Sequence, residues 1–409
     1  MIDLAWIEAA LVSARPQALG ALVRYFRDVE VAEEAFQEAS LRALKTWPDN
    51  GPPRNPAAWL IMVGRNSALD VARRQRKQGE MPQHEPVDEA SEVALADRLD
   101  DAHYRDDVLR LLFICCHPEL PVTQQVALAL RIVSGLGVPQ IARAFLITET
   151  AMEQRITRAK HRIARADVPF EAPDALERAE RLTAVAAMVY LIFNEGYSAG
   201  REDADRAQLC DEAIRLGRLL MSLFAGEPEL MGLTALMLLQ HARSSARFDR
   251  DGNLVLLEAQ DRSLWNRLLI AEGLAMLDKA MRHRQPGPYQ VQAAIAALHA
   301  RAETADATDW AQIDLLYANL ERLQPSPVVT LNRAVAVSKV KGPAAALAMI
   351  EALAGKLDGY FHFHGVKGAL LLQLGRRKDA KACLDRAISL ANTAAEAAHI
   401  RMHLDQLTK

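Results

Sequence analysis

Closely spaced basic side chains are the first residues in this sequence whose types and spacing indicate a chemistry. Residues 65–77 carry five of them against one acid, Asp70, a balance of +4. Such a face attracts phosphates by counterion release, and Arg and Asn also read base edges. A merely solvated helix face is the other interpretation. The candidate DNA-binding residues are Arg65, Asn66, Arg73, Arg74, Arg76 and Lys77.

Trp59 lies just upstream of this basic segment, in the sequence Pro-Ala-Ala-Trp-Leu. An indole ring offers a flat surface on which an unpaired base can stack. It is equally suited to anchor a hydrophobic core, and both roles remain open at this point.

A second basic segment, residues 138–163, has the pattern of two helices joined by a tight turn. In its second half an apolar stripe at helical spacing turns inward, and polar and basic side chains occupy the other faces. This pattern is typical of a helix-turn-helix, whose second helix enters a major groove. A charged antiparallel helix pair is the alternative. Thr150 with Glu153 fits a capping box, although Thr148 could also cap the helix. The inward positions are Met152, Ile156, Ala159 and Ile163, and the positions toward the flanks and outside are Gln154, Arg155, Thr157, Arg158, His161 and Arg162.

Other reactive groups in the sequence indicate neither catalysis nor a metal site. Cys115 and Cys116 are adjacent and lack a second cysteine or histidine pair, so buried thiols at a helix end are expected. The segment 249–253 resembles the start of a calcium loop, but its glycine falls at the fourth position rather than the sixth, which favours a turn. Glu195 and Tyr197 lack a partnered nucleophile, and helix-corner packing is the favoured interpretation. We therefore expect no catalytic residue, no cofactor and no metal.

The elements that must position these residues are predicted to be helices throughout. The chain has 409 residues, 50% of them hydrophobic and 5% aromatic, and is rich in Ala and Leu, which favours an all-α fold. Prolines near residues 48–56 and the acidic stretch 80–107, with ten acids against two arginines, interrupt the helical pattern. We expect a helical domain at 1–78, an acidic linker at 79–107, a helix-turn-helix domain at 108–166 and a C-terminal helical domain at 167–409.

The end of the C-terminal domain shows a weak internal repeat. Ala346 and Ala380, like Ile350 and Leu384, are 34 positions apart, which is the period of tetratricopeptide repeats. An irregular helical domain is the alternative. No apolar stretch reaches the roughly 18 residues that a bilayer requires, and four cysteines do not form a disulfide framework. We expect a cytoplasmic protein that does not bind a membrane.

The ordered motifs at 30–44, 55–60, 65–70 and 138–163 resemble regions 2 and 4 of the extracytoplasmic-function (ECF) sigma factors. The segments 113–120, 189–197, 260–265 and 308–310 resemble the ECF subgroup that carries a long C-terminal extension with tetratricopeptide-like repeats. The resemblance implies a transcription initiation factor that binds the β′ clamp and the β subunit of core RNA polymerase and recognises promoter DNA.

The same resemblance assigns roles to individual residues. An acidic helix bearing Glu33, Glu34, Gln37 and Glu38 would dock on polymerase. Residues 48–77 would melt and read the −10 element. The −35 element would be contacted by the second helix of the helix-turn-helix, through Thr150, Gln154, Arg155, Arg158 and Lys160. The C-terminal domain would regulate activity or bind a regulatory protein. A helical-repeat scaffold without initiation activity is the alternative function, and an enzyme with its site at Glu195 and Tyr197 is a distant third.

Overall fold

The computed structural model describes residues 5–51, 53–76, 101–145, 147–165, 175–198, 204–250, 252–391 and 400. The all-α prediction is confirmed for these ranges, whose regular elements are helices joined by turns and one isolated bridge between Phe248 and Leu254. The chain divides into two compact units, residues 1–192 and 193–409. The division falls within helix α9 (Ala175–Tyr197) rather than at the expected boundary near residue 166.

Three long helices open the first unit, and each packs on the other two. They are α1 (Ala5–Phe26), α2 (Val29–Asn50) and α3 (Pro56–Arg76). Asp28 caps α2 by accepting hydrogen bonds from the backbone N–H groups of Glu30 and Val31 at 2.8 and 3.1 Å. Gly51 follows α2 with φ +75°, a conformation that favours glycine, and so ends the helix before the proline-rich turn.

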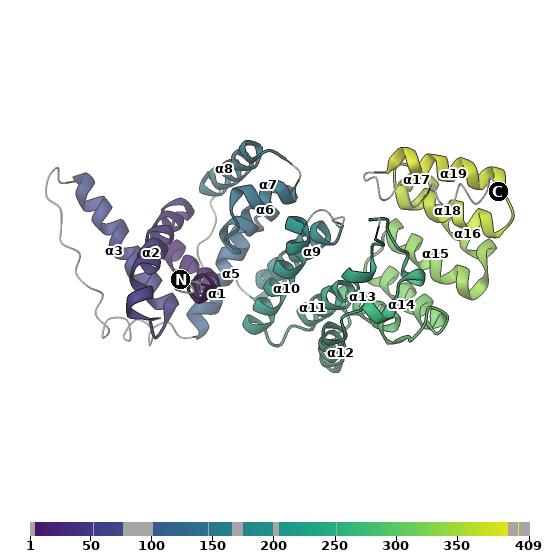
Figure 1. The fold of residues 1–409 in the computed structure, drawn as a ribbon, viewed down its shortest axis with the longest axis horizontal. Helices are drawn as coiled ribbons and strands as arrows, with labels where there is room; N and C mark the ends of the chain where they lie inside the picture. Colours follow the sequence, from purple (N-terminus) through teal and green to yellow (C-terminus); the bar gives the residue numbers. More distant parts are fainter. Residues whose placement is uncertain are drawn as a thin grey trace. The chain divides into compact units, whose positions relative to one another are not determined.

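Four shorter helices follow among the described residues 101–165 of the same unit (Figure 1). Helices α6 and α7 both pack on α8, α5 packs on α1, and α8 touches α2. The buried positions of α8 are Met152, Ile156, Ala159 and Ile163, which confirms the predicted inward stripe. The four helices are α5 (Asp101–Cys115), α6 (Val122–Ile132), α7 (Val138–Ala144) and α8 (Glu149–Arg165).

The expected acidic linker is shorter than predicted at its C-terminal end. Helix α5 begins at Asp101, and Asp107, expected in the linker, is 1% exposed. Its carboxylate pairs with Arg110 at 2.9 Å and with Arg24 of α1 at 3.4 Å. Gly20 of α1 permits this close packing, because a Cβ there would lie 2.7 Å from the Asp107 carbonyl oxygen. Residues 77–100 lie outside the described ranges.

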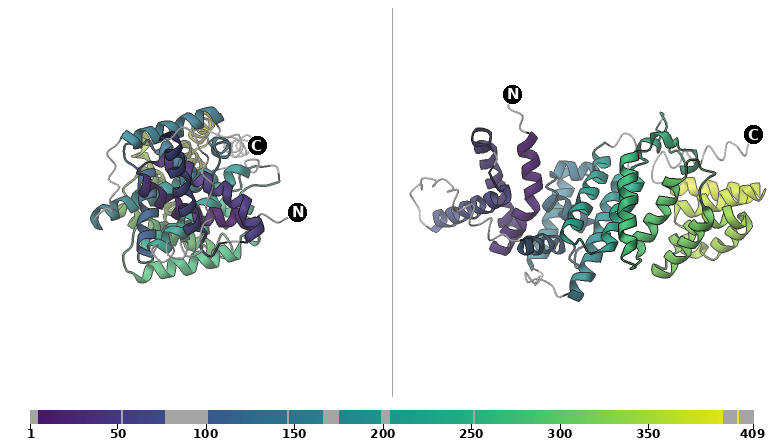
Figure 2. Two further views of the ribbon diagram at one scale, coloured as in Figure 1. Left: turned by 90° about the vertical axis from the view of Figure 1, so that its left-hand side faces the viewer. Right: turned by 90° about the horizontal axis from the view of Figure 1, so that it is seen from below.

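The second unit is built of helices in which near neighbours along the chain pack against one another (Figures 1 and 2). Its first half contains α10 (Ala204–Leu223), α11 (Pro228–His241), α12 (Arg267–Arg282) and α13 (Pro288–Arg301), with short 3-10 turns η1 (Ser244–Ala246), η2 (Leu257–Ala259) and η3 (Arg262–Leu264) between α11 and α12. Its second half contains α14 (Trp310–Leu323), α15 (Pro327–Lys341), α16 (Pro343–Glu351), α17 (Ala354–Leu357), α18 (Phe361–Gln373) and α19 (Arg377–Leu390).

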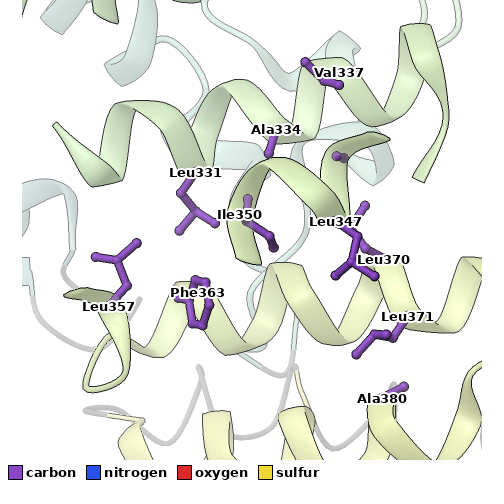
Figure 3. Packing of buried hydrophobic residues seen from close by; sticks show 11 residues of the cluster. Leu331, Ala334, Val337, Leu347, Ile350, Leu357, Phe363, Leu370, Leu371 and Ala380 are labelled. Atoms are coloured by element: carbon purple, nitrogen blue, oxygen red, sulfur yellow. The ribbon is translucent and has the colours of Figure 1, made fainter. Parts of the chain in front are cut away.

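Two helical hairpins near the end of this unit are separated by 34 residues, the repeat interval that the sequence suggested. Helices α15 and α18 begin at Pro327 and Phe361, and α16 and α19 begin at Pro343 and Arg377, which are both intervals of 34 residues. The predicted repeat positions Ala346, Ala380, Ile350 and Leu384 are all buried. Figure 3 shows how Leu331, Ile350 and Phe363, from α15, α16 and α18, share one core.

Among the described helices, none combines the length and apolarity that a bilayer crossing needs.

Candidate nucleic-acid interface

The second helix of the predicted helix-turn-helix, α8, presents a polar face. Thr148 caps it, since its hydroxyl oxygen accepts a hydrogen bond from the backbone N–H of Ala151 at 3.2 Å. Thr150 therefore lies within the helix and does not cap it. Of the two caps that the sequence allowed, Thr148 is the one observed, and the capping box of Thr150 with Glu153 does not form. Thr150, Gln154 and Arg158 are exposed.

Two further candidate contacts on α8 are engaged within the first unit. The Arg155 guanidinium lies 6.0 Å from the centre of the Phe145 ring and is half-buried. The Lys160 ammonium donates a hydrogen bond of 2.6 Å to Oε2 of Glu33 in α2. Gln154 and Arg158, with Thr150, thus form the part of the predicted DNA-contacting set that faces water here.

The candidate residues of α3 divide into packed and exposed positions. Trp59 is half-buried and meets Trp47 edge to face at a centroid distance of 5.3 Å, in a cluster that also contains Ile7 and Ala43. Trp59 thus packs against this cluster, and its stacking on an unpaired base stays a prediction. The Arg65 guanidinium lies 4.2 Å from the centre of the Tyr25 ring, whereas Asn66 is exposed. Arg73, Arg74 and Arg76 occupy the last turns of α3, but their side chains, like all of Lys77, fall outside the described part.

Helix α2 carries the predicted polymerase-docking residues, and three of the four are exposed. Glu34, Gln37 and Glu38 face water. Leu41 and Leu44, one turn further along, are 53% and 44% exposed. The buried face of α2 does not include these leucines and consists of Ala32, Glu33, Ala35, Phe36, Ala39, Ala43 and Trp47. Exposed leucines bordered by polar side chains are a feature of protein-docking faces, whose rims are polar.

Glu33, the fourth predicted docking residue, is buried in a cluster of three cations. Its side chain is 4% exposed. Its Oε1 lies 3.0 Å from Nε of Arg131 and 3.8 Å from Nη2 of Arg15, and its Oε2 accepts the Lys160 bond. The Arg131 contact lacks the alignment of a hydrogen bond. These cations come from α1, α6 and α8, so one carboxylate of α2 joins the N-terminal helices to the helix-turn-helix.

Arg15 strengthens the same junction through the backbone of α6. Its Nε donates to the carbonyl of Ile132 at 2.9 Å and its Nη2 donates to the carbonyl of Arg131 at 3.1 Å. These are the last carbonyls of α6, where a cation is favoured. Burial lowers the pKa of Arg15 to about 10, and the charge of Glu33 opposes that shift. Sequence reasoning found Glu33 and Lys160 separately, but not their pairing and not Arg15 or Arg131.

The remaining reactive groups have structural surroundings. Cys115 and Cys116 are buried at the end of α5, as predicted, and burial raises the pKa of the Cys116 thiol to about 12. The described ends of segment 249–253 lie together, since the Asn253 carbonyl accepts a hydrogen bond from the Asp249 N–H at 3.0 Å, consistent with the expected turn. Glu195 pairs with Arg206 at 3.4 Å, consistent with the predicted helix-corner packing.

Three family models match this chain. Residues 11–78 match sigma-70 region 2, residues 110–163 match sigma-70 region 4, and residues 181–281 match a family of unknown function (DUF6596). An uncharacterized protein of Rhizobium meliloti (strain 1021) is 67% identical over 411 residues, which cover 100% of this chain and 97% of that protein. No solved structure matches. The helices α1 to α3 and the helix-turn-helix thus coincide with the two sigma-70 regions, so the chain carries regions 2 and 4 of the sigma-70 family and belongs to one family with the Rhizobium meliloti protein.

Proposed function

We propose that this protein is an ECF-type sigma factor that binds core RNA polymerase, recognises −10 and −35 promoter elements and promotes promoter opening, without itself being an enzyme. The observation that carries the proposal is the pair of exposed faces on α2 and α8. The first offers Glu34, Gln37 and Glu38 to a protein partner, and the second offers Gln154 and Arg158 to a major groove. Both lie within segments matched by sigma-70 models.

We also propose that the helical unit 193–409 regulates this activity or binds a partner protein, as a tetratricopeptide-like array. The support is the 34-residue interval between its two last hairpins and the match of residues 181–281 to a family outside the two sigma regions. Stacked hairpins of this kind create extended surfaces suited to protein ligands.

The Glu33 cluster adds a conformational element to the proposal. Lys160, a proposed −35 contact, and Glu33, a proposed polymerase contact, bind each other at 2.6 Å. A side chain cannot serve both partners at once, so the pair has to open before either residue meets its target. The factor free of polymerase is then held in a closed arrangement of its two DNA-binding regions.

Run-off transcription with core polymerase on the gene's own upstream region tests the proposal, with core binding recorded in the same samples. The full-length protein is compared with Arg158→Gln and with Arg301→Gln, a matched loss of one exposed arginine in α13. We expect transcription by wild type and Arg301→Gln, and a marked loss in Arg158→Gln with core binding retained. If the wild-type protein does not bind core polymerase, the alternative of a helical scaffold without initiation activity replaces this one.

A further inference from the structure

Two arginines of the second unit, Arg243 and Arg247, contact Tyr197, and a third, Arg262, lies in the neighbouring turn η3. Nη2 of Arg243 donates a hydrogen bond of 2.8 Å to the Tyr197 hydroxyl. The Arg247 guanidinium lies 3.7 Å from the centre of the Tyr197 ring and donates to the Tyr197 carbonyl. Arg262 joins them because η1 and η3 pack together and the Asn266 N–H binds the Ala242 carbonyl at 2.8 Å. All three arginines are half-buried.

The bonding partners of these arginines are uncharged. Nη1 of Arg262 donates to the carbonyls of His299 and Ala302, at 2.5 and 2.8 Å, where α13 ends. Arg243 and Arg247 bind the hydroxyl and the carbonyl of Tyr197. Within the described residues, no carboxylate lies within ion-pairing distance of any of the three.

Other partly buried arginines of the same unit are neutralised by acids. Arg206 pairs with Glu195, Arg215 pairs with Glu212 at 2.7 Å, and Arg333 pairs with Asp314 and Glu321 at 2.7 Å. The cluster of Arg243, Arg247 and Arg262 is thus an exception within its own unit. Helix C-terminal carbonyls supply part of the missing negative charge.

The donor geometry leaves capacity for a ligand. A guanidinium has five N–H donors, and the hydrogen bonds of each arginine to described residues use two at most. The ring contacts of Arg247 with Tyr197 and of Arg262 with Trp265, at 4.6 Å, hold the guanidinium planes in place. Fixed guanidinium groups with spare donors are suited to oxyanions, which they bind by two parallel hydrogen bonds.

The pKa of His299 also indicates that Arg243 and Arg262 lie near each other. Its pKa is lowered to about 4, first by burial and then by the charges of Arg243 and Arg262. The ring packs edge to face on Trp310. His299 is therefore neutral at pH 7, and the positive charge of the cluster belongs to the arginines.

We propose that Arg243, Arg247 and Arg262 form a binding site for a phosphate group, either the free ion or a phosphate carried by a small molecule. The three cations have no carboxylate partners among the described residues. A doubly charged phosphate therefore complements their charge better than a ligand with one carboxylate group would. The site lies within the segment that matches the family of unknown function. It gives that segment a ligand, and it stands independently of the sigma activity.

Calorimetric titration of the full-length protein at constant ionic strength tests the site, with inorganic phosphate and AMP as the two probes. The variants are Arg243→Gln and, as a matched control, Arg218→Gln, which removes an exposed arginine paired with Glu272 at 2.8 Å. We expect saturable binding to wild type and Arg218→Gln, weakened about tenfold or more in Arg243→Gln because a hydrogen bond to a charged group is lost. Tighter binding of AMP identifies a carried phosphate as the ligand, and equal binding identifies the free ion.

Tyr197→Phe keeps the test decisive if Arg243→Gln does not fold. It retains every charge but removes the hydroxyl that orients Arg243, so we expect weaker phosphate binding than in wild type. The proposal is overturned if neither probe binds wild type saturably, or if the site variants bind phosphate as tightly as Arg218→Gln does.

Discussion

Replacing Glu33 by Gln should loosen the junction between the N-terminal helices and the helix-turn-helix. The substitution keeps the shape of the side chain but removes the charge that faces Arg15, Arg131 and Lys160. Removing one partner of a buried ion pair costs about 3–5 kcal/mol. Lys160 and Arg131 are 20% and 23% exposed and can turn towards water, and Arg15 keeps its two carbonyl partners. We therefore expect a cost of about 2–3 kcal/mol.

Hydrogen exchange of the full-length protein measures this cost where it arises. Some amides of α8 exchange only when the helix separates from α2. In Glu33→Gln their exchange should be about 30- to 140-fold faster, which is the factor that corresponds to about 2–3 kcal/mol. Glu38→Gln is the matched control, because Glu38 lies on the same helix but is 49% exposed and, among the described residues, pairs with Arg42 at 3.2 Å. Its effect should stay below about 0.5 kcal/mol.

The result that refutes this reasoning is equal protection of α8 in Glu33→Gln and Glu38→Gln. A second readout separates the closed arrangement from a plain docking role. If the Glu33–Lys160 pair holds the factor closed, Glu33→Gln should raise the affinity of the free protein for promoter DNA. If Glu33 serves only to contact polymerase, the variant should lose core binding while the protection of α8 and the affinity for DNA stay unchanged.

Three further predictions follow from particular contacts. Gly20→Ala should destabilise the first unit by about 1–3 kcal/mol, because the added Cβ meets the backbone of Asp107. Gly355→Ala is the control, because the space around Gly355 is open and no loss of stability is expected there. Thermal unfolding compares the two variants. Arg158→Gln should weaken promoter binding across salt concentrations and reduce the salt slope by about one, if Arg158 contacts a phosphate; a slope equal to that of Arg301→Gln would contradict this. Arg243→Gln should raise the pKa of His299 from about 4 towards its usual value, because a neighbouring cation disfavours the imidazolium; NMR titration of the ring measures the shift, and an unchanged pKa would show that the two groups are not close.

The sequence by itself determined the helical fold class and the two DNA-binding segments. Apolar residues at three-to-four spacing are a local signal, which is why Met152, Ile156, Ala159 and Ile163 were identified as the buried stripe of α8. The resemblance of four ordered motifs to the ECF sigma factors likewise predicted regions 2 and 4, which the sigma-70 models match. Two pairs of alanine and aliphatic positions in the sequence also indicated the interval of 34 residues at which the last two hairpins recur.

Only the tertiary structure decided which charges meet. Glu33 and Lys160 are 127 positions apart, and nothing in their local sequence distinguishes a buried pair from two exposed binding residues. Asp107 resembled the acidic stretch before it, yet packing against Gly20 and pairing with Arg24 bury it. Arg243, Arg247 and Arg262 come together through turns with no helical or strand periodicity. The spacing of apolar residues shows which face of a single helix is buried. Ion pairs and anion sites depend instead on how separate helices and turns pack together, which only the tertiary structure determines.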